Sequence, residues 1–364
     1  MHRSGTSALT GLLAGLGFAL PPPGDLIEGR PDNPVHFESQ ALIEVNDDLL
    51  HAFHGSWQAP PVLDGAWEDT PTARAFDQRS REVLAATYKA PGGKVWKDPR
   101  LCLLLPYWSR LLAPPSPAVL IWRHPSEVAD SLTRRDGFTA SRGLALWDTY
   151  TRSCLTNLAG RPTFVLRTDD LLDDPHNVAQ SLADWLERQG ATPGGGVDLD
   201  RERAVGAINA DLPHRAGAES RTTPPGLEGL VHLLAELVGP HDALPGVELP
   251  PPVAWMNDLL EEQRGVVALS RGNQILSDSH HALIDEYTNL ISRHDAVESE
   301  MSLLRDEVAA LRHDASAAAE HADRVEVELD RVRSSRSWKL TAPLRMVGGR
   351  NLDEPARAPS PEST

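Results

Sequence analysis

The sequence has little cysteine, few aromatic residues, no excess of positive charge and no long apolar run. Two cysteines, Cys102 and Cys154, are too few for a disulfide framework or a zinc knuckle, and they favour a reducing cytoplasm. The formal net charge of -17 argues against a protein that coats nucleic acid. No stretch approaches the roughly 20 apolar residues of a membrane span. The composition predicts a soluble, cytoplasmic protein, and none of the 14 histidines has the spacing of a metal ligand, so no metal site is predicted.

Helical and strand-like segments alternate from Ser4 to about residue 190. Helices are predicted at 7–16, 38–54, 71–88, 100–112, from Pro125 onward and at 176–189. Strands are predicted at 95–96, 118–122 and 163–167. This alternation is typical of an α/β fold with a mostly parallel sheet covered on both faces. Residues 197–250 are expected to form a smaller, partly helical lid or annex that ends in a stiff proline-rich stretch.

The C-terminal part of the chain follows a seven-residue repeat. Apolar or alanine residues recur in steps of four and three at Val297, Met301, Leu304, Val308, Leu311, Ala315, Ala318, Ala322, Val325, Leu329 and Val332. Sustained spacing of this kind with charged flanks predicts a coiled coil, and hence a homo-oligomer that is most simply a parallel dimer. A single amphipathic helix folded back on the core is the alternative.

A basic tail follows the repeat. Residues 331–352 contain six basic and no acidic side chains, with Trp338 and Leu340 between them. Such a tail can lie on an anionic membrane, which predicts a peripheral position at the inner membrane face, although a solvated tail is the alternative. The predicted organisation is a globular domain (1–250), a linker and helical segment (251–280), a coiled coil (281–336) and a basic, then disordered tail (337–364).

The first residues, HRSGTS, run directly into an apolar helix. Backbone N–H groups and the positive end of a helix favour a bound anion such as a phosphate. The loop is not a Walker A sequence, because Arg3 precedes Gly5 and no lysine stands before Thr6 or Ser7, so a P-loop kinase is disfavoured. Phosphate loops normally follow a buried strand. We therefore expect a short Val/Ile-rich strand upstream of Met1, which the domain as given lacks.

A second polar element, WRHPSEVADSL, spans residues 122–132. Arg123 stands at the carboxyl end of a predicted strand, where open parallel sheets bind ligands, and Ser131 follows eight positions later on the next helix. An arginine fork and a serine hydroxyl are suited to a second phosphate.

Together the two elements resemble the sulfotransferases that use 3′-phosphoadenosine 5′-phosphosulfate, and most closely their bacterial and carbohydrate-directed branch. The resemblance extends over WKDPRLCLLLPYW (96–108), SLTRRDGF (131–138) and LRTDDLLDDP (166–175), and it covers roughly residues 1–190. It implies a three-layer fold like that of P-loop-containing nucleotide-binding proteins, followed here by the long coiled-coil helix. It also implies the phosphosulfate nucleotide as co-substrate.

The resemblance assigns roles to individual positions. Arg3 matches the basic residue that contacts the phosphosulfate and assists catalysis, and the cradle is formed by Ser4, Gly5, Thr6 and Ser7. Arg123 and Ser131 match the pair that holds the 3′-phosphate. Sulfuryl transfer depends mainly on positioning and on neutralising charge on the leaving phosphate, which a cation at Arg3 would do.

The acceptor hydroxyl must also lose a proton. NPVHFESQ (33–40) resembles the family's stretch that carries this base, which points to Glu38, with His36 as its competitor. The alternative is that Glu38 caps the helix 39–54. Lys97 can reach the sulfuryl or leaving-group oxygens, unless Lys97, Asp98 and Arg100 only form an ion pair that stiffens a turn.

The sequence thus predicts transfer of a sulfuryl group to a hydroxyl. The segment RSSRSWKLTAPLR resembles the ends of bacterial enzymes of surface-polysaccharide assembly, which points to a glycan or glycolipid of the cell surface as acceptor. The alternative function is that of a non-catalytic coiled-coil interaction protein with a degenerate or truncated sulfotransferase domain.

Overall fold

The computed structural model describes residues 1–29, 36–89, 92–112, 116–193, 200–206 and 222–341. The protein is a mixed α/β protein that is mostly helical, and the chain divides into two units, Met1–Gln274 and Ile275–Thr364. The first unit contains the sheet and the elements that position the candidate site.

The sheet of the first unit has three strands in the described part of the chain. β1 (Ala118–Trp122) and β2 (Thr163–Arg167) pair in parallel, with Ala118 opposite Thr163. β3 (Gly239–His241) pairs antiparallel to β2. The predicted strands at 118–122 and 163–167 are therefore found at their predicted bounds. β3 comes from the segment expected to form a lid or annex, and it completes the sheet instead, so the sheet is mixed.

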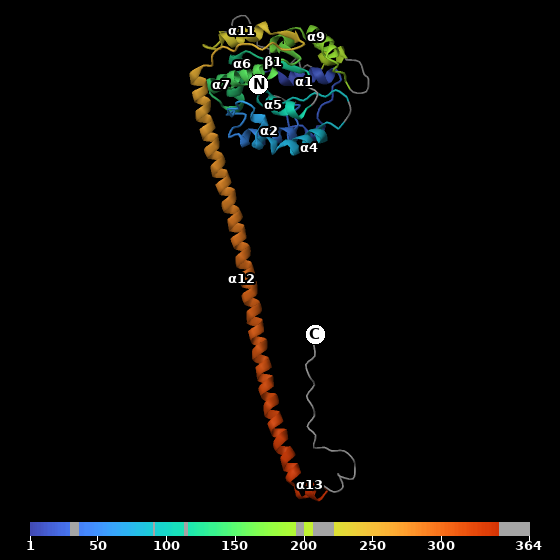
Figure 1. The fold of residues 1–364 in the computed structure, drawn as a ribbon, viewed down its shortest axis with the longest axis vertical. Coiled ribbons are helices and arrows are strands. Elements are labelled where there is room, and N and C mark those ends of the chain that lie inside the picture. Colours follow the sequence, from blue (N-terminus) through green and yellow to red (C-terminus); the bar gives the residue numbers. More distant parts are fainter. Residues whose placement is uncertain (30–35, 90–91, 113–115, 194–199, 207–221, 342–364) are drawn as a thin grey trace. The chain divides into compact units, whose positions relative to one another are not determined.

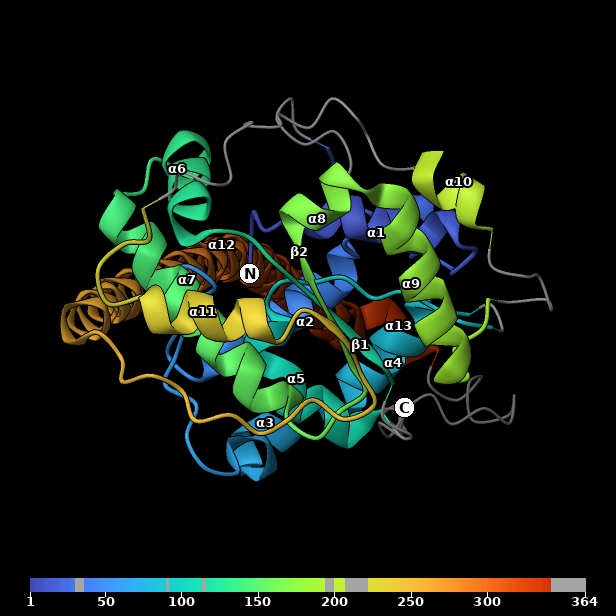
Figure 2. The ribbon, with the colours of Figure 1, turned by 90° about the horizontal axis from the view of Figure 1, so that it is seen from above.

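Helices lie on both sides of the strands, as Figures 1 and 2 show. In the described residues before Ala254, the helices of this unit are α1 (Thr6–Gly15), α2 (Gln40–Ala52), α3 (Pro71–Arg74), α4 (Asp77–Thr87), α5 (Leu101–Leu111), α6 (Pro125–Asp136), α7 (Ala140–Leu158), α8 (Thr168–Asp173), α9 (Pro175–Arg188), α10 (Arg201–Gly206) and α11 (Glu228–Glu236). Two 3-10 turns, η1 (Pro23–Asp25) and η2 (Trp67–Asp69), join them. The helix expected over 71–88 is divided into α3 and α4.

The strands divide the core because successive side chains point to opposite faces of a sheet. On one face Leu120, Trp122 and Val165 pack with residues of α2, α5, α7 and α11. On the other face Ile121, Phe164 and Leu166 pack with residues of α1 and α9. Both faces of the sheet are thus covered, as the alternation in the sequence predicted.

α6 and α7 pack closely at one glycine. A Cβ atom at Gly143 of α7 would lie 2.7 Å from the Cα atom of Ala129 on α6, which is far too short for two carbon atoms. Thr139 begins α7 by accepting a hydrogen bond from the backbone N–H of Arg142. This packing holds α6, which carries Ser131, against the long helix α7.

The prediction of a strand at 95–96 is wrong. Lys94 forms only an isolated bridge with Ala19, and no ladder develops there. A cavity of about 1090 Å³ lies between this segment and β1, and its lining includes Val95 and Lys97 of the segment and Val119 and Ile121 of β1. Across that gap the segment has no described strand with which to pair, so two β-favouring residues do not form a strand.

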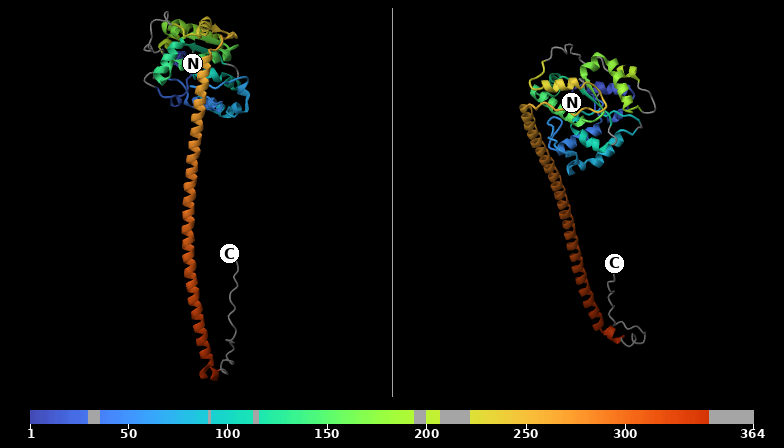
Figure 3. Two further views of the ribbon diagram at one scale, coloured as in Figure 1. Left: turned by 90° about the vertical axis from the view of Figure 1, so that its left-hand side faces the viewer. Right: turned by 45° about the horizontal axis from the view of Figure 1, so that its top comes forward.

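The helix α12 runs from Ala254 to Ser334, a length of 81 residues, and Figures 1 and 3 show it as one continuous helix. Met256 and Leu260 in its first turns belong to the core of the first unit. The short helix α13 (Arg336–Leu340) follows. Most of the predicted basic tail, from residue 342 onward, lies outside the described residues. Among the described helices none combines the length and the apolar character that crossing a membrane requires.

Candidate functional site

The N-terminal loop is fastened to the carboxyl ends of the two parallel strands. The hydroxyl of Thr168, which follows β2, donates to the carbonyl of Ser4 at 2.8 Å and lies 3.0 Å from the carbonyl of Trp122 at the end of β1. Gly5 has the left-handed φ of 81°, and a Cβ there would lie 2.8 Å from Cγ2 of Thr168. The loop and the start of α1 therefore lie at the edge of the sheet where open α/β proteins bind ligands.

The start of α1 is suited to an anion. Gly5 occupies the N-cap position and provides no side-chain acceptor for the first N–H groups of the helix, which have no partner within the helix. Ser4 adds a hydroxyl oxygen that is buried and has no hydrogen-bond partner among the described residues. Backbone N–H groups and the positive end of the helix thus favour an anion here, whereas the Ser4 hydroxyl lines a small enclosed space among core residues such as Trp122 and Tyr150.

Arg3 connects the loop to the second polar element. Its Nε donates to Oγ of Ser131 on α6 at 2.8 Å, and the Ser131 side chain is buried. Arg3 itself adopts a positive φ of 65°, which is uncommon for a residue with a side chain. The structure therefore brings together two residues that are 128 positions apart and that the sequence assigned to two separate anion sites.

Arg123 lies at the end of β1 and faces α6. Its Nε donates to Oε2 of Glu127 at 3.1 Å, and its carbonyl accepts a hydrogen bond from the Trp147 indole at 2.9 Å. The guanidinium remains partly exposed. Any anion that binds Arg123 competes with the Glu127 carboxylate for the same donors.

Glu38 and Lys97 form a buried ion pair next to the loop. Nζ of Lys97 lies 2.5 Å from Oε1 of Glu38 and 3.5 Å from Oγ of Ser7 in the first turn of α1. Nδ1 of His36 lies 3.6 Å from the other carboxylate oxygen of Glu38. The predicted base, its competitor, the predicted lysine and the loop serine are therefore within one cluster, although they come from three separate segments.

Burial controls the protonation of this pair. Burial raises the pKa of Glu38, and the nearby Lys97 ammonium opposes part of that rise. Burial likewise lowers the pKa of Lys97, against the influence of Glu38. A carboxylate with a raised pKa takes up a proton more readily, which suits a general base.

Glu38 does not cap α2. The N-cap residue is Ser39, whose hydroxyl accepts a hydrogen bond from the Leu42 N–H at 3.1 Å. The same hydroxyl donates to Asp25 at 2.5 Å. The capping alternative for Glu38 is wrong, because its carboxylate turns to Lys97.

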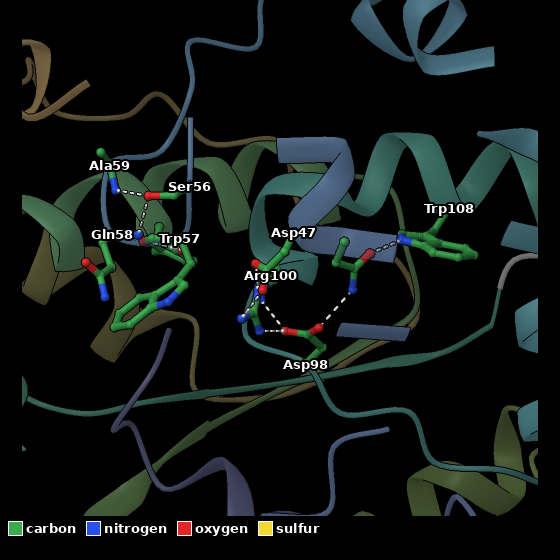
Figure 4. A network of polar contacts seen from close by, with 10 residues as sticks. Asp47, Ser56, Trp57, Gln58, Ala59, Asp98, Arg100 and Trp108 are labelled. Atoms are coloured by element: carbon green, nitrogen blue, oxygen red, sulfur yellow. Dashed lines mark hydrogen bonds and ion pairs between the residues drawn. The ribbon is translucent and has the colours of Figure 1, made fainter. Parts of the chain in front are cut away.

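Asp98 and Arg100 belong to a separate, internally satisfied network (Figure 4). Arg100 donates to Asp98 at 3.1 Å and to both carboxylate oxygens of Asp47 at 2.6 and 3.0 Å. Asn46 donates to Asp98 at 2.8 Å and accepts from the Trp108 indole at 2.8 Å. Burial alone would lower the pKa of Arg100, but Asp98 and Asp47 outweigh it and raise that pKa. The ion pair expected at this turn therefore exists between Asp98 and Arg100, while Lys97 pairs elsewhere.

Sequence reasoning missed Asn46 and His2. Asn46 lies on the buried side of α2, between Leu42 and Leu49, and a polar residue on an apolar helix face was the available signal. The rings of His2 and Trp57 are tilted against one another with centroids 4.5 Å apart, and burial lowers the pKa of His2 well below 6.5. An uncharged His2 thus packs behind the loop without adding a positive charge to it.

Neither a scan against protein-family models nor searches of curated proteins and of solved structures find a match for this chain. The function is therefore argued from the geometry of these residues.

Proposed function

We propose that the unit Met1–Gln274 is a sulfotransferase that uses 3′-phosphoadenosine 5′-phosphosulfate. The observation that carries the proposal is the cluster of Glu38, Lys97 and Ser7. In it the Lys97 ammonium lies within 3.5 Å of both the buried Glu38 carboxylate and the Ser7 hydroxyl in the first turn of α1. Sulfuryl transfer needs these three components: a proton acceptor, a positive charge and a cradle for the donor.

In the proposed reaction, the acceptor hydroxyl attacks the sulfur of the donor while Glu38 takes its proton. A new bond forms between the acceptor oxygen and sulfur, and the bond between sulfur and the bridging oxygen breaks. The electron pair of that bond goes to the 5′-phosphate, whose charge Lys97 and Arg3 neutralise. The products are a sulfate ester and adenosine 3′,5′-bisphosphate, so atoms and charge balance.

The nucleotide's 3′-phosphate is proposed to bind between Arg123 and Ser131. The hydrogen bond from Arg3 to Ser131 supports this assignment, because it makes the two anion sites neighbours. The loop between the strand ends and α1 supports, in the same way, a fold like that of P-loop-containing nucleotide-binding proteins. The proposed acceptor is a glycan or glycolipid of the cell surface, modified in the cytoplasm or at the inner membrane face.

Binding of adenosine 3′,5′-bisphosphate tests the proposal. At a ligand concentration 100 times Kd, binding to the folded state adds about 2.7 kcal/mol of stability and raises Tm by several degrees. ATP serves as the comparison. Stabilisation by ATP alone would indicate a kinase-like nucleotide site, and stabilisation by neither would favour the non-catalytic interaction protein.

A further inference from the structure

The apolar seam of α12 begins well before Val297. Before Val297, leucines recur every seven residues at Leu290, Leu283, Leu276 and Leu269, and they occupy the same heptad position as Val297, d. The other seam position, a, is occupied over this stretch by Val266, Asn273, His280, Tyr287 and His294. Every d position from Leu269 to Val332 is therefore apolar, and the seam is roughly 100 Å long at 1.5 Å per helical residue.

The seam is exposed in the single chain. Its large apolar side chains from Val266 to Val332 are all exposed to solvent, among them Leu276 at 68% and Leu304 at 53%. An apolar stripe of this length, unbroken at d and interrupted at a only by Asn273, His280 and His294, is unusual for a surface that remains in water. A helix in a protein also gains most of its stability by packing its apolar face against another element, and this face has no such partner in the described part of the chain.

We propose that α12 pairs with α12 of a second copy in a parallel, in-register, two-stranded coiled coil that begins at Val266. The charged residues that flank the seam identify the partner as a second copy of the same helix. In a parallel pair, each g residue lies beside the e residue five positions later on the other helix. This places Arg293 beside the partner's Glu298, Glu300 beside the partner's Arg305, Glu307 beside the partner's Arg312, and Glu328 beside the partner's Arg333. All four pairs are attractive, and no g–e′ pair along the seam joins like charges.

An antiparallel pair would lose this complementarity. In that arrangement g residues face g residues of the other helix, and apart from Arg293 and His321 the titratable g residues are all acidic: Glu286, Glu300, Glu307, Asp314 and Glu328. With the two seams overlapping fully, Glu300 would face its own copy. The distribution of acidic residues therefore selects the parallel orientation.

The polar a positions select the register. Asn273 is the type of residue that fixes register and two-stranded pairing when it occupies an a position, at some cost in stability. His280 and His294 add two further polar layers that match only when equal residues lie side by side. These layers all precede Val297, in the part of the seam that the repeat from Val297 onward does not include.

Sedimentation of the full-length chain tests the pairing. We expect a dimer, and we expect Leu304→Asp to raise its dissociation constant on the order of 10²–10⁴-fold, because two leucines leave the interface and two carboxylates enter it. The matched control is Leu303→Asp at the outward c position, which is 72% exposed and should leave the dimer intact. A monomeric or trimeric wild-type chain, or equal effects of the two variants, would overturn the proposal.

The start of the seam is tested by a second matched pair. Leu276→Asp should weaken the dimer by the same order, whereas Ile275→Asp, which is 56% exposed at a c position, should not. No effect of Leu276→Asp would overturn the start at Val266.

Oxidative cross-linking tests the orientation. His294→Cys should form a disulfide-linked dimer, because equal a residues meet only in the parallel register, while Ser292→Cys at the outward f position should not. Failure of His294→Cys to cross-link in a chain that sediments as a dimer would overturn the parallel arrangement.

Discussion

The two units of this protein place charge and apolar surface in opposite ways. In Met1–Gln274 the side chains of Glu38, Lys97, Asp98 and Arg100 are buried. In Ile275–Thr364 the large leucines and valines of α12 are exposed. Each arrangement is costly alone, because buried charge loses hydration and exposed apolar surface orders water.

The difference lies in how each cost is offset. In the first unit the Arg100 network is satisfied by its own members, whereas the Glu38–Lys97 pair borders a helix start that is open to an anion. In the second unit the described chain offers the seam no apolar cover. The first arrangement points to a ligand and the second to another chain, and the following experiments separate these interpretations.

The largest expected effect is on turnover. Glu38→Gln should reduce the rate of sulfuryl transfer by about 10²–10⁴-fold, the usual contribution of a positioned base, while donor binding persists. The rate is measured with labelled donor, and binding by the Tm shift with adenosine 3′,5′-bisphosphate. If His36→Ala produced this pattern and Glu38→Gln did not, the base would be the histidine.

The next effect is on folding. Arg100→Met leaves Asp98 buried without its cation and should lower the free energy of unfolding by about 3–5 kcal/mol. Arg79→Met is the matched control, because it breaks an ion pair with Asp48 in which both side chains are 47% exposed. That pair should contribute only about 0–1 kcal/mol. Equal losses in urea denaturation would show that burial does not distinguish the two arginines.

A third effect concerns pH. The base must be deprotonated to act, so kcat/KM should rise with pH as Glu38 loses its proton. Because burial raises the pKa of Glu38, this acidic limb should lie above 4.5, the ordinary value of a glutamate. Below the limb the rate should fall about tenfold per pH unit. A limb at or below 4.5, or one that persists in Glu38→Gln, would argue against Glu38.

Local signals in the sequence were sufficient for some elements and not for others. β1 and β2 are short apolar runs bounded by polar or proline residues, and their bounds were predicted correctly. β3 consists of Gly239, Pro240 and His241, which carry no strand signal, and it exists because β2 offers an edge. The strand expected at Val95 fails for the opposite reason, since its residues favour a strand but have no described neighbour across the cavity.

The same distinction applies to the candidate site. The polar residues at the strand end and in the loop could be selected from their positions, and the structure places Arg3 on Ser131 and Lys97 on Glu38. Which acid pairs with which base could not be predicted, because Lys97, Asp98 and Arg100 are neighbours in sequence with partners on different segments. Only the packing of α2 directs Asp47 to Arg100 and leaves Lys97 to Glu38.

The smallest effects concern the proposed 3′-phosphate site, and they compare a charged with an uncharged donor. Arg123→Ala should weaken binding of adenosine 3′,5′-bisphosphate by about 10- to 100-fold, and Ser131→Ala by less than about tenfold, because hydrogen bonds from a cation to phosphate are roughly twice as strong as neutral ones. Arg74→Ala removes the same charge at an exposed position and should change nothing. Calorimetric titration measures all three affinities. Unchanged affinity in Arg123→Ala would contradict the placement of the 3′-phosphate beside Arg123. The guanidinium would then pair with Glu127 and contribute nothing to the binding of the phosphate.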